Sequence, residues 1–367
     1  MTRINDSSVG GPARALRDDD TVPMRRLALP PDGHDTPPMH TSTPTPFTSA
    51  APNAPRALAP TNSELGLIRV RRAPKSGWRR AVYRATGLNL GESAKETNRR
   101  ALIDRVNRPV RGPISIAVLS QKGGVGKTTT TVGLGATLAA MRGDRVIAVD
   151  ANPDFGTLAQ RGPDETDSTV RDVLLDDNIV RYSDMRRHTS QGASRLEILA
   201  SERDPATSEV FSEADFRGVL RVLERFYDIV LTDCGTGLVH SAMAGVLAEA
   251  DAIVIVASPA VDSARSALAT LDWLEHNGYS RLIPGATVVV CASQPGPLGL
   301  DMNRLASNFL PRVHALHMIP FDDHLAEGSE INPELFSRQT RQAFLQLAGT
   351  IANSLFSTSA PDRFSRM

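Results

Sequence analysis

One stretch of the 367-residue chain decides its fold: Ser120-Gln121-Lys122-Gly123-Gly124-Val125-Gly126-Lys127-Thr128-Thr129-Thr130. It follows an apolar run of strand length, residues 114–119, and it leads into a stretch of helical period, residues 129–141. The three glycines let the backbone curl so that its N–H groups point inward, and such a curl at a helix N-terminus binds anions. The stretch therefore predicts a phosphate-binding loop between a strand and a helix.

The side chains of this loop suit a nucleoside triphosphate accompanied by Mg²⁺. Lys127 would neutralise the β- and γ-phosphates, the Thr128 hydroxyl would ligate Mg²⁺, and Thr129 would reach the α-phosphate. The residues expected to bind the nucleotide here are Gln121, Lys122, Gly123, Gly124, Val125, Gly126, Lys127, Thr128 and Thr129.

Apolar runs of strand length alternate with helical stretches on both sides of the loop. The expected strands are residues 114–119, 146–149, 196–199, 229–232, 252–257, 286–291 and 315–319. Continuous apolar strands separated by helices are typical of a parallel sheet that is buried on both faces. We therefore expect an α/β fold over residues 113–356, with a doubly wound and mostly parallel sheet.

The loop closely resembles the deviant Walker A loop of the ParA/MinD family of ATPases. Gln121 stands where the ordinary pattern has its first glycine, and Lys122 adds a second lysine. The resemblance extends from residue 114 to about residue 355. It implies that ATP and Mg²⁺ are the cofactors and that the chain is an ATPase. It also implies an ATP-dependent homodimer in which Lys122 reaches the nucleotide of the partner.

The segment Val149-Asp150-Ala151-Asn152-Pro153 departs from the family's pattern. Relatives typically have Asp-x-Asp-Pro here, and the second aspartate helps to position the attacking water. Asn152 can hydrogen-bond a water but cannot accept a proton from it. The resemblance thus gives Lys122, Lys127, Asp150 and Asn152 as the catalytic set. We expect hydrolysis to be slow or stimulated by a partner, and a nucleotide-binding protein with little hydrolysis is an alternative.

Two later segments resemble other nucleotide contacts of the family. Residues 226–235 look like a Walker B strand, so Asp233 is expected to hold Mg²⁺ through water, with Thr128 as the second metal-site residue. The segment Ile319-Pro320-Phe321-Asp322 is similar to the family's Ile-Pro-x-Asp segment, in which the proline lies beside the base. Pro320 is therefore the expected neighbour of the adenine.

The charge of the chain is unevenly distributed, although 41 basic and 41 acidic residues give no net charge. Residues 1–60 hold eleven of the 25 prolines and few apolar side chains, which predicts a disordered tail. Residues 61–112 form the expected basic, partly helical arm, because fourteen basic residues face four acidic ones within residues 56–111. Residues 112–367 carry a net charge of −9, and residues 357–367 form an expected polar tail.

The basic arm leaves several partners open. Residues Arg69–Arg111 can bind nucleic acid, an anionic membrane or an acidic partner, or the arm can pack on its own acidic body. The whole arrangement looks like the actinobacterial ParA/MinD-like proteins of type VII (ESX) secretion. That resemblance implies a protein partner in a secretion or positioning system. The alternatives are a DNA-partition ATPase that binds nonspecific DNA through the arm, and a metabolic enzyme on the same scaffold.

Disulfide-rich, clustered-metal, membrane-spanning and secreted proteins are not expected from this sequence. Cys234 and Cys291 lie far apart, which excludes a disulfide framework and a clustered metal site. No run approaches the ~18 uncharged apolar residues of a transmembrane helix. The first residues lack the apolar core of a secretory signal. We therefore expect a cytoplasmic protein without a transmembrane segment, which a partner can recruit to a membrane.

Overall fold

A parallel sheet organises the computed structural model, which describes residues 77–86, 93–152, 156–201, 211–297 and 299–357. The expected tail at residues 1–60, part of the expected basic arm and nearly all of the expected polar tail lie outside the described residues. The strands are β1 (Ile114–Leu119), β2 (Val146–Ala151), β3 (Ser190–Gln191), β4 (Glu197–Leu199), β5 (Ile229–Cys234), β6 (Ala252–Ala257), β7 (Thr287–Cys291) and β8 (Ala315–Ile319).

The strand order in the sheet is β3-β4-β2-β5-β1-β6-β7-β8, and the strands pair in parallel except for β3 with β4. The expected α/β fold with a mostly parallel, doubly wound sheet is therefore confirmed. The short antiparallel edge strand β3 was not expected, because two residues carry no usable periodicity.

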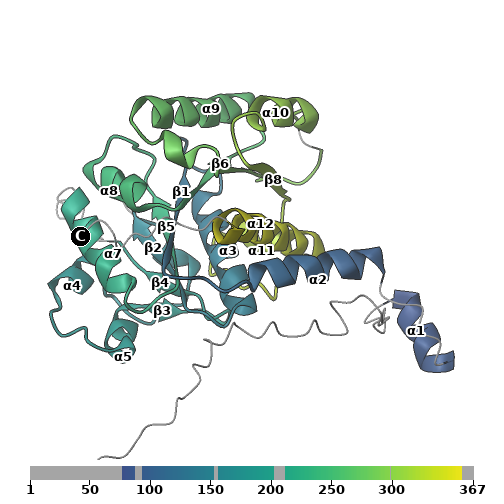
Figure 1. The fold of residues 1–367 in the computed structure, drawn as a ribbon, viewed down its shortest axis with the longest axis horizontal. Coiled ribbons are helices and arrows are strands. Elements are labelled where there is room, and N and C mark those ends of the chain that lie inside the picture. The colour runs from purple at the N-terminus through teal and green to yellow at the C-terminus, as the bar shows by residue number, and fades with distance from the viewer. Residues whose placement is uncertain (1–76, 87–92, 153–155, 202–210, 298, 358–367) are drawn as a thin grey trace, which may run out of the picture. The chain divides into compact units, whose positions relative to one another are not determined.

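Helices cover both faces of the sheet (Figure 1). The helices of this part of the chain are α2 (Ala94–Val106), α3 (Lys127–Met141), α4 (Val170–Leu175), α5 (Tyr182–Met185), α7 (Glu213–Leu223), α8 (Ser241–Glu249), α9 (Val261–His276), α10 (Met302–Phe309), α11 (Asp323–Ala326) and α12 (Arg338–Ser357). A separate helix, α1, spans Gly77–Thr86.

Alternate residues of the central strand build the two halves of the core. Ala117 and Leu119 of β1 pack with buried residues of α7, α8, α9 and α10. Ile116 and Val118 pack on the other face with buried residues of α3 and α12. This alternation is the two-residue period of a strand, and it explains why a central strand is apolar at every position.

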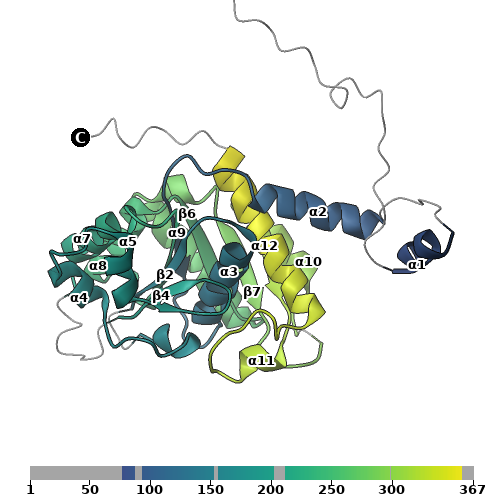
Figure 2. The same ribbon diagram turned by 90° about the horizontal axis from the view of Figure 1, so that it is seen from below.

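Helices α3 and α12 lie side by side against one face (Figure 2). A Cβ atom added at Gly133 of α3 would lie 2.3 Å from the Phe344 ring of α12, so only glycine permits this approach. The apolar face of α12 is buried, with Phe344, Leu347 and Ala348 inaccessible to solvent. Among the described helices, none is both long and apolar enough to cross a bilayer.

Helix α2 comes from the sequence segment expected to form the basic arm, and it packs on α12 and α3. Ser93 and Glu96 form a reciprocal cap at its N-terminus. Leu102 contacts α12 at Gly349, and Val106 is fully buried. The guanidinium of Arg142, at the end of α3, donates to the carbonyls of Val106 and Arg108. Part of the basic segment is thereby built into the globular body.

Candidate functional site

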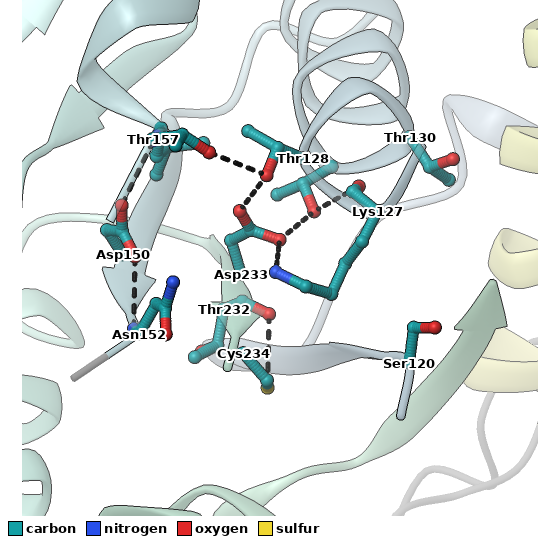
Figure 3. Close-up of polar contacts among 12 residues, drawn as sticks. Ser120, Lys127, Thr128, Thr130, Asp150, Asn152, Thr157, Thr232, Asp233 and Cys234 are labelled. Atoms are coloured by element: carbon teal, nitrogen blue, oxygen red, sulfur yellow. Dashed lines mark hydrogen bonds and ion pairs between the residues drawn. The ribbon is translucent and has the colours of Figure 1, made fainter. Parts of the chain in front are cut away.

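The register of three neighbouring strands brings the predicted site residues together. Val118 of β1 pairs with Asp233 of β5, and Asp150 of β2 pairs with the same aspartate from the other side. Because these strands are parallel, their carboxyl ends share one edge of the sheet, beside the start of α3. Figure 3 shows the resulting cluster, with Asp233 between Asp150 and Lys127.

Two glycines give the loop after β1 its shape. Gly124 and Gly126 have φ angles of +72° and +91°, which L side chains rarely adopt. A Cβ atom at Gly126 would also lie 2.8 Å from the Cys291 sulfur at the end of β7. Val125 is buried between them and anchors the loop in the core. The first N–H groups of an α-helix have no partner within the helix, so this end of α3 can bind an anion.

Asp233 is the centre of the polar contacts inside the loop. Lys127 Nζ donates to Asp233 Oδ1 at 2.8 Å, and Thr128 Oγ1 donates to Asp233 Oδ2 at 2.6 Å. Thr131 Oγ1 lies 3.1 Å from Asp233 Oδ1. Asp233 is itself almost fully buried, so these three partners replace water in stabilising its carboxylate. Thr129, expected at the α-phosphate, is buried in the first turn of α3.

The residues at this point fit a magnesium ion that accompanies a nucleotide. The Thr128 hydroxyl and the Asp233 carboxylate are hard oxygen donors, which Mg²⁺ prefers. Among the described residues, no cluster of three or more His, Cys, Asp or Glu side chains could hold a metal by itself. Mg²⁺ is usually held by one or two protein oxygens together with waters and phosphate, and Thr128 and Asp233 would supply two such oxygens.

The Asp150 carboxylate is buried and already accepts two backbone hydrogen bonds. Asn152 N donates to Oδ1 and Leu158 N donates to Oδ2, both at 3.0 Å. Burial and the neighbouring Asp233 raise the pKa of Asp150 to about 7, and the two N–H donors oppose this shift. Asn152 is half-buried beside it (Figure 3). Both carboxylate oxygens of Asp150 are thus hydrogen-bonded to backbone N–H groups of the residues that follow β2.

Lys122 lies on the outer side of the phosphate-binding loop. Its ammonium forms an ion pair with Asp262 in the first turn of α9, and both side chains reach solvent. Gln121 and the glycines Gly123 and Gly124 are also exposed. Within one chain, the second lysine therefore points away from the cluster around Asp233, where Lys127 lies.

Pro320 follows β8 at the same edge of the sheet. Ile319, the residue before it, pairs with Cys291, which in turn contacts Gly126 of the loop. Pro320 is half-buried there. Its position is compatible with a contact to a base next to the loop, and this role stays a prediction.

The structure adds four residues that sequence reasoning did not place in the site: Thr131, Thr157, Asp262 and Cys291. Thr131 follows Lys127 by one helical turn, so its position could have been predicted from the period of α3. Asp262, Cys291 and Thr157 come from distant elements or from a loop, and no local pattern identifies them.

Comparison with known proteins agrees with this geometry. A family model described as an AAA domain matches residues 114–275. The ESX-1 secretion-associated protein EspI of Mycobacterium tuberculosis is 38% identical over 279 residues, which are 76% of this chain and 42% of EspI. The sporulation initiation inhibitor protein Soj of Bacillus subtilis is 34% identical over 131 residues, covering 34% of this chain and 50% of Soj.

A solved structure supports the same conclusion. The septum site-determining protein MinD of Pyrococcus horikoshii, complexed with Mg-ADP, superposes with a TM-score of 0.53 at 25% identity, over 64% of this chain and 94% of MinD. The predicted resemblance is therefore confirmed: the chain is ParA/MinD-like, with the P-loop fold of that group, and it is similar in sequence to an ESX secretion-associated protein. It spans less than half the length of EspI.

Proposed function

We propose that this ParA/MinD-like chain is a switch ATPase that binds Mg-ATP in its phosphate-binding loop and dimerises around the nucleotide. The contact of Lys127 and Thr128 with Asp233, at the N-terminus of α3, carries this proposal. It combines a cation for phosphate, a hydroxyl and a carboxylate for Mg²⁺, and a helix end that binds anions. The Mg-ADP complex of the MinD relative supports the choice of ligands.

The chain's own residues divide the work of phosphoryl transfer between binding and positioning. Lys127 and the first N–H groups of α3 bind and orient the terminal phosphates, and Mg²⁺ supplies positive charge that offsets the charge developing on them. The Asn152 amide can orient a water molecule but cannot accept its proton. We therefore propose slow hydrolysis, with Lys122 of a second copy completing the site.

A switch of this kind acts through a partner that has different affinities for the nucleotide states. The similarity to EspI supports a partner in an ESX (type VII) secretion assembly, whose activity or position the nucleotide state would regulate. The similar segment is 42% of EspI, so this part of the proposal concerns the ATPase domain alone.

A second candidate is binding of nonspecific DNA, and the surface of α2 favours it. Lys95, Arg99 and Arg105 of this helix are exposed, as are Arg108 and Arg111 just after it. These exposed cations would attract a phosphate backbone and would give binding that weakens steeply with salt.

Single-turnover hydrolysis of ATP with Mg²⁺ tests the proposal, with the wild type beside Lys127→Ala and with or without duplex DNA. Turnover by the wild type that the variant loses supports an ATPase despite Asn152. Stimulation by DNA would favour a role in DNA partition over a role in secretion. Tight ATP binding without turnover would leave a nucleotide-held switch, and wild-type turnover in Lys127→Ala would contradict the proposed site.

A further inference from the structure

The segment between β2 and the short 3₁₀ helix Ala159–Arg161 is described at both of its ends, and residues 156–158 lie beside the phosphate-binding loop. Its two ends are joined through one carboxylate, because Asn152 N and Leu158 N both donate to Asp150. Leu158 is fully buried in the core next to α3. The position of the residues just before Leu158 is thus set by a buried anchor.

Gly156 brings this segment into direct contact with Asp150. A Cβ atom at Gly156 would lie 2.1 Å from Asp150 Oδ2 and 2.0 Å from Ser201 Oγ, so the backbone fits there only without a side chain. Thr157 therefore lies between a glycine pressed against Asp150 and the buried Leu158. Its exposed side chain projects toward the start of α3 (Figure 3).

The Thr157 hydroxyl meets the metal-site threonine. Thr157 Oγ1 lies 3.3 Å from Thr128 Oγ1, and Thr128 Oγ1 lies 2.6 Å from Asp233 Oδ2. A hydroxyl has one proton to donate and two lone pairs that accept. Because Thr128 gives its proton to the Asp233 carboxylate, Thr157 must be the donor to Thr128. One lone pair of Thr128 then accepts from Thr157, and the other remains for Mg²⁺.

We propose that Thr157 is a positioning residue of the magnesium site: its hydroxyl orients that of Thr128, and Asp150 and Gly156 hold it in place. This inference rests on the proposed function, because it needs Mg²⁺ to bind with the nucleotide. Asp150 thereby influences the magnesium site indirectly, because it accepts a hydrogen bond from the backbone next to Thr157. The loop that carries Asn152 is tied to the same carboxylate, so the magnesium site and the expected water-positioning residue share one support.

The test measures how strongly Mg²⁺ tightens nucleotide binding by the full chain. The probe is fluorescent N-methylanthraniloyl-ADP, titrated in EDTA and in increasing MgCl₂. Thr157→Val keeps the shape and removes the hydroxyl. The loss of one neutral hydrogen bond corresponds to roughly a three- to tenfold change in an equilibrium constant. The MgCl₂ concentration that gives half of the Mg²⁺-dependent gain in affinity, here called the Mg²⁺ requirement, should therefore rise by about that factor. Affinity in EDTA should stay unchanged, and Thr157→Ser should restore the wild-type Mg²⁺ requirement.

Two further variants separate this role from general damage. Thr137→Val is the matched control, because the Thr137 hydroxyl donates to the Gly133 carbonyl within α3 and has no link to the site. Gly156→Ala keeps the Thr157 hydroxyl but displaces it, so it should also raise the Mg²⁺ requirement. A wild-type requirement in Thr157→Val would overturn this inference alone. Failure of the wild type to bind the probe would overturn the proposed function as well.

Discussion

Two lysines of one loop, five positions apart, have opposite environments. The Lys127 side chain is 12% exposed, and its partner Asp233 is 2% exposed. The Lys122 side chain is 42% exposed, and its partner Asp262 is 67% exposed. A protected ion pair with further hydrogen bonds holds its geometry, whereas an exposed pair is weakened by water and salt and is easily exchanged. The loop thus has an inner side, at Lys127 and Asp233, whose contacts are fixed. Its outer side, at Lys122 and Asp262, has an ion pair that other partners can easily replace.

The neighbours of the two lysines reinforce this difference. Thr128 and Thr131 complete the contacts of Asp233 on the inner side. On the outer side, Val261 precedes Asp262 and is 57% exposed. An exposed apolar side chain at the ligand-binding edge of the sheet is what a second copy of the chain would cover. The proposed dimer therefore involves the outer side.

Lys127→Ala should have the largest effect, because it removes the cation that faces the phosphates. Nucleotide affinity should fall by about 100-fold, a loss of about 2.7 kcal/mol of binding free energy. Equilibrium binding of a fluorescent nucleotide measures it. A melting temperature close to that of the wild type would show that the loss does not come from unfolding. Affinity within a factor of about two of the wild type, less than 0.5 kcal/mol, would contradict the assignment of the inner side.

Lys122→Ala should separate dimerisation from binding. The variant should bind nucleotide nearly as well as the wild type, because Lys122 points away from Asp233 within its own chain. It should remain monomeric with Mg²⁺ and a non-hydrolysable ATP analogue, as measured by light scattering after gel filtration. Dimers at the wild-type level would rule out a role for Lys122 across the interface. Loss of nucleotide binding would instead show that Lys122 contacts the nucleotide of its own chain.

The residues of the inner side could be singled out from the sequence because the patterns that mark them are local. The loop glycines, Lys127 and Thr128 are consecutive with the helix that they open, and Asp233 ends an apolar run. The strands β1, β6 and β8 have the predicted bounds, since an apolar run between helices marks its own ends. These features depend on neighbours in the chain, which a single sequence displays directly.

The sequence could not predict contacts that depend on how distant elements meet. Asp262 reaches Lys122 only because β6 lies beside β1 in the sheet. Thr157 reaches Thr128 because the hydrogen bond from Leu158 N to Asp150 holds residues 156–158 beside the start of α3. The sequence left the role of α2 open, because the partly buried Leu102 and the buried Val106 are few among exposed cations. In each case the role of the residue can be recognised only when the order of the strands and the packing of the helices are known.

Asp262→Asn should have the smallest effect and should strengthen the dimer. The substitution removes the charge that holds Lys122 within its own chain, so the lysine becomes free to reach a partner's nucleotide. Because the pair is exposed, the gain should be small and should fade as salt is added. Sedimentation equilibrium with Mg²⁺ and a non-hydrolysable ATP analogue measures it at low and high salt. Glu275→Gln, an exposed acid of the same helix that pairs with Arg312, is the matched control. A weaker dimer in Asp262→Asn would mean that Asp262 supports the interface and does not compete with it.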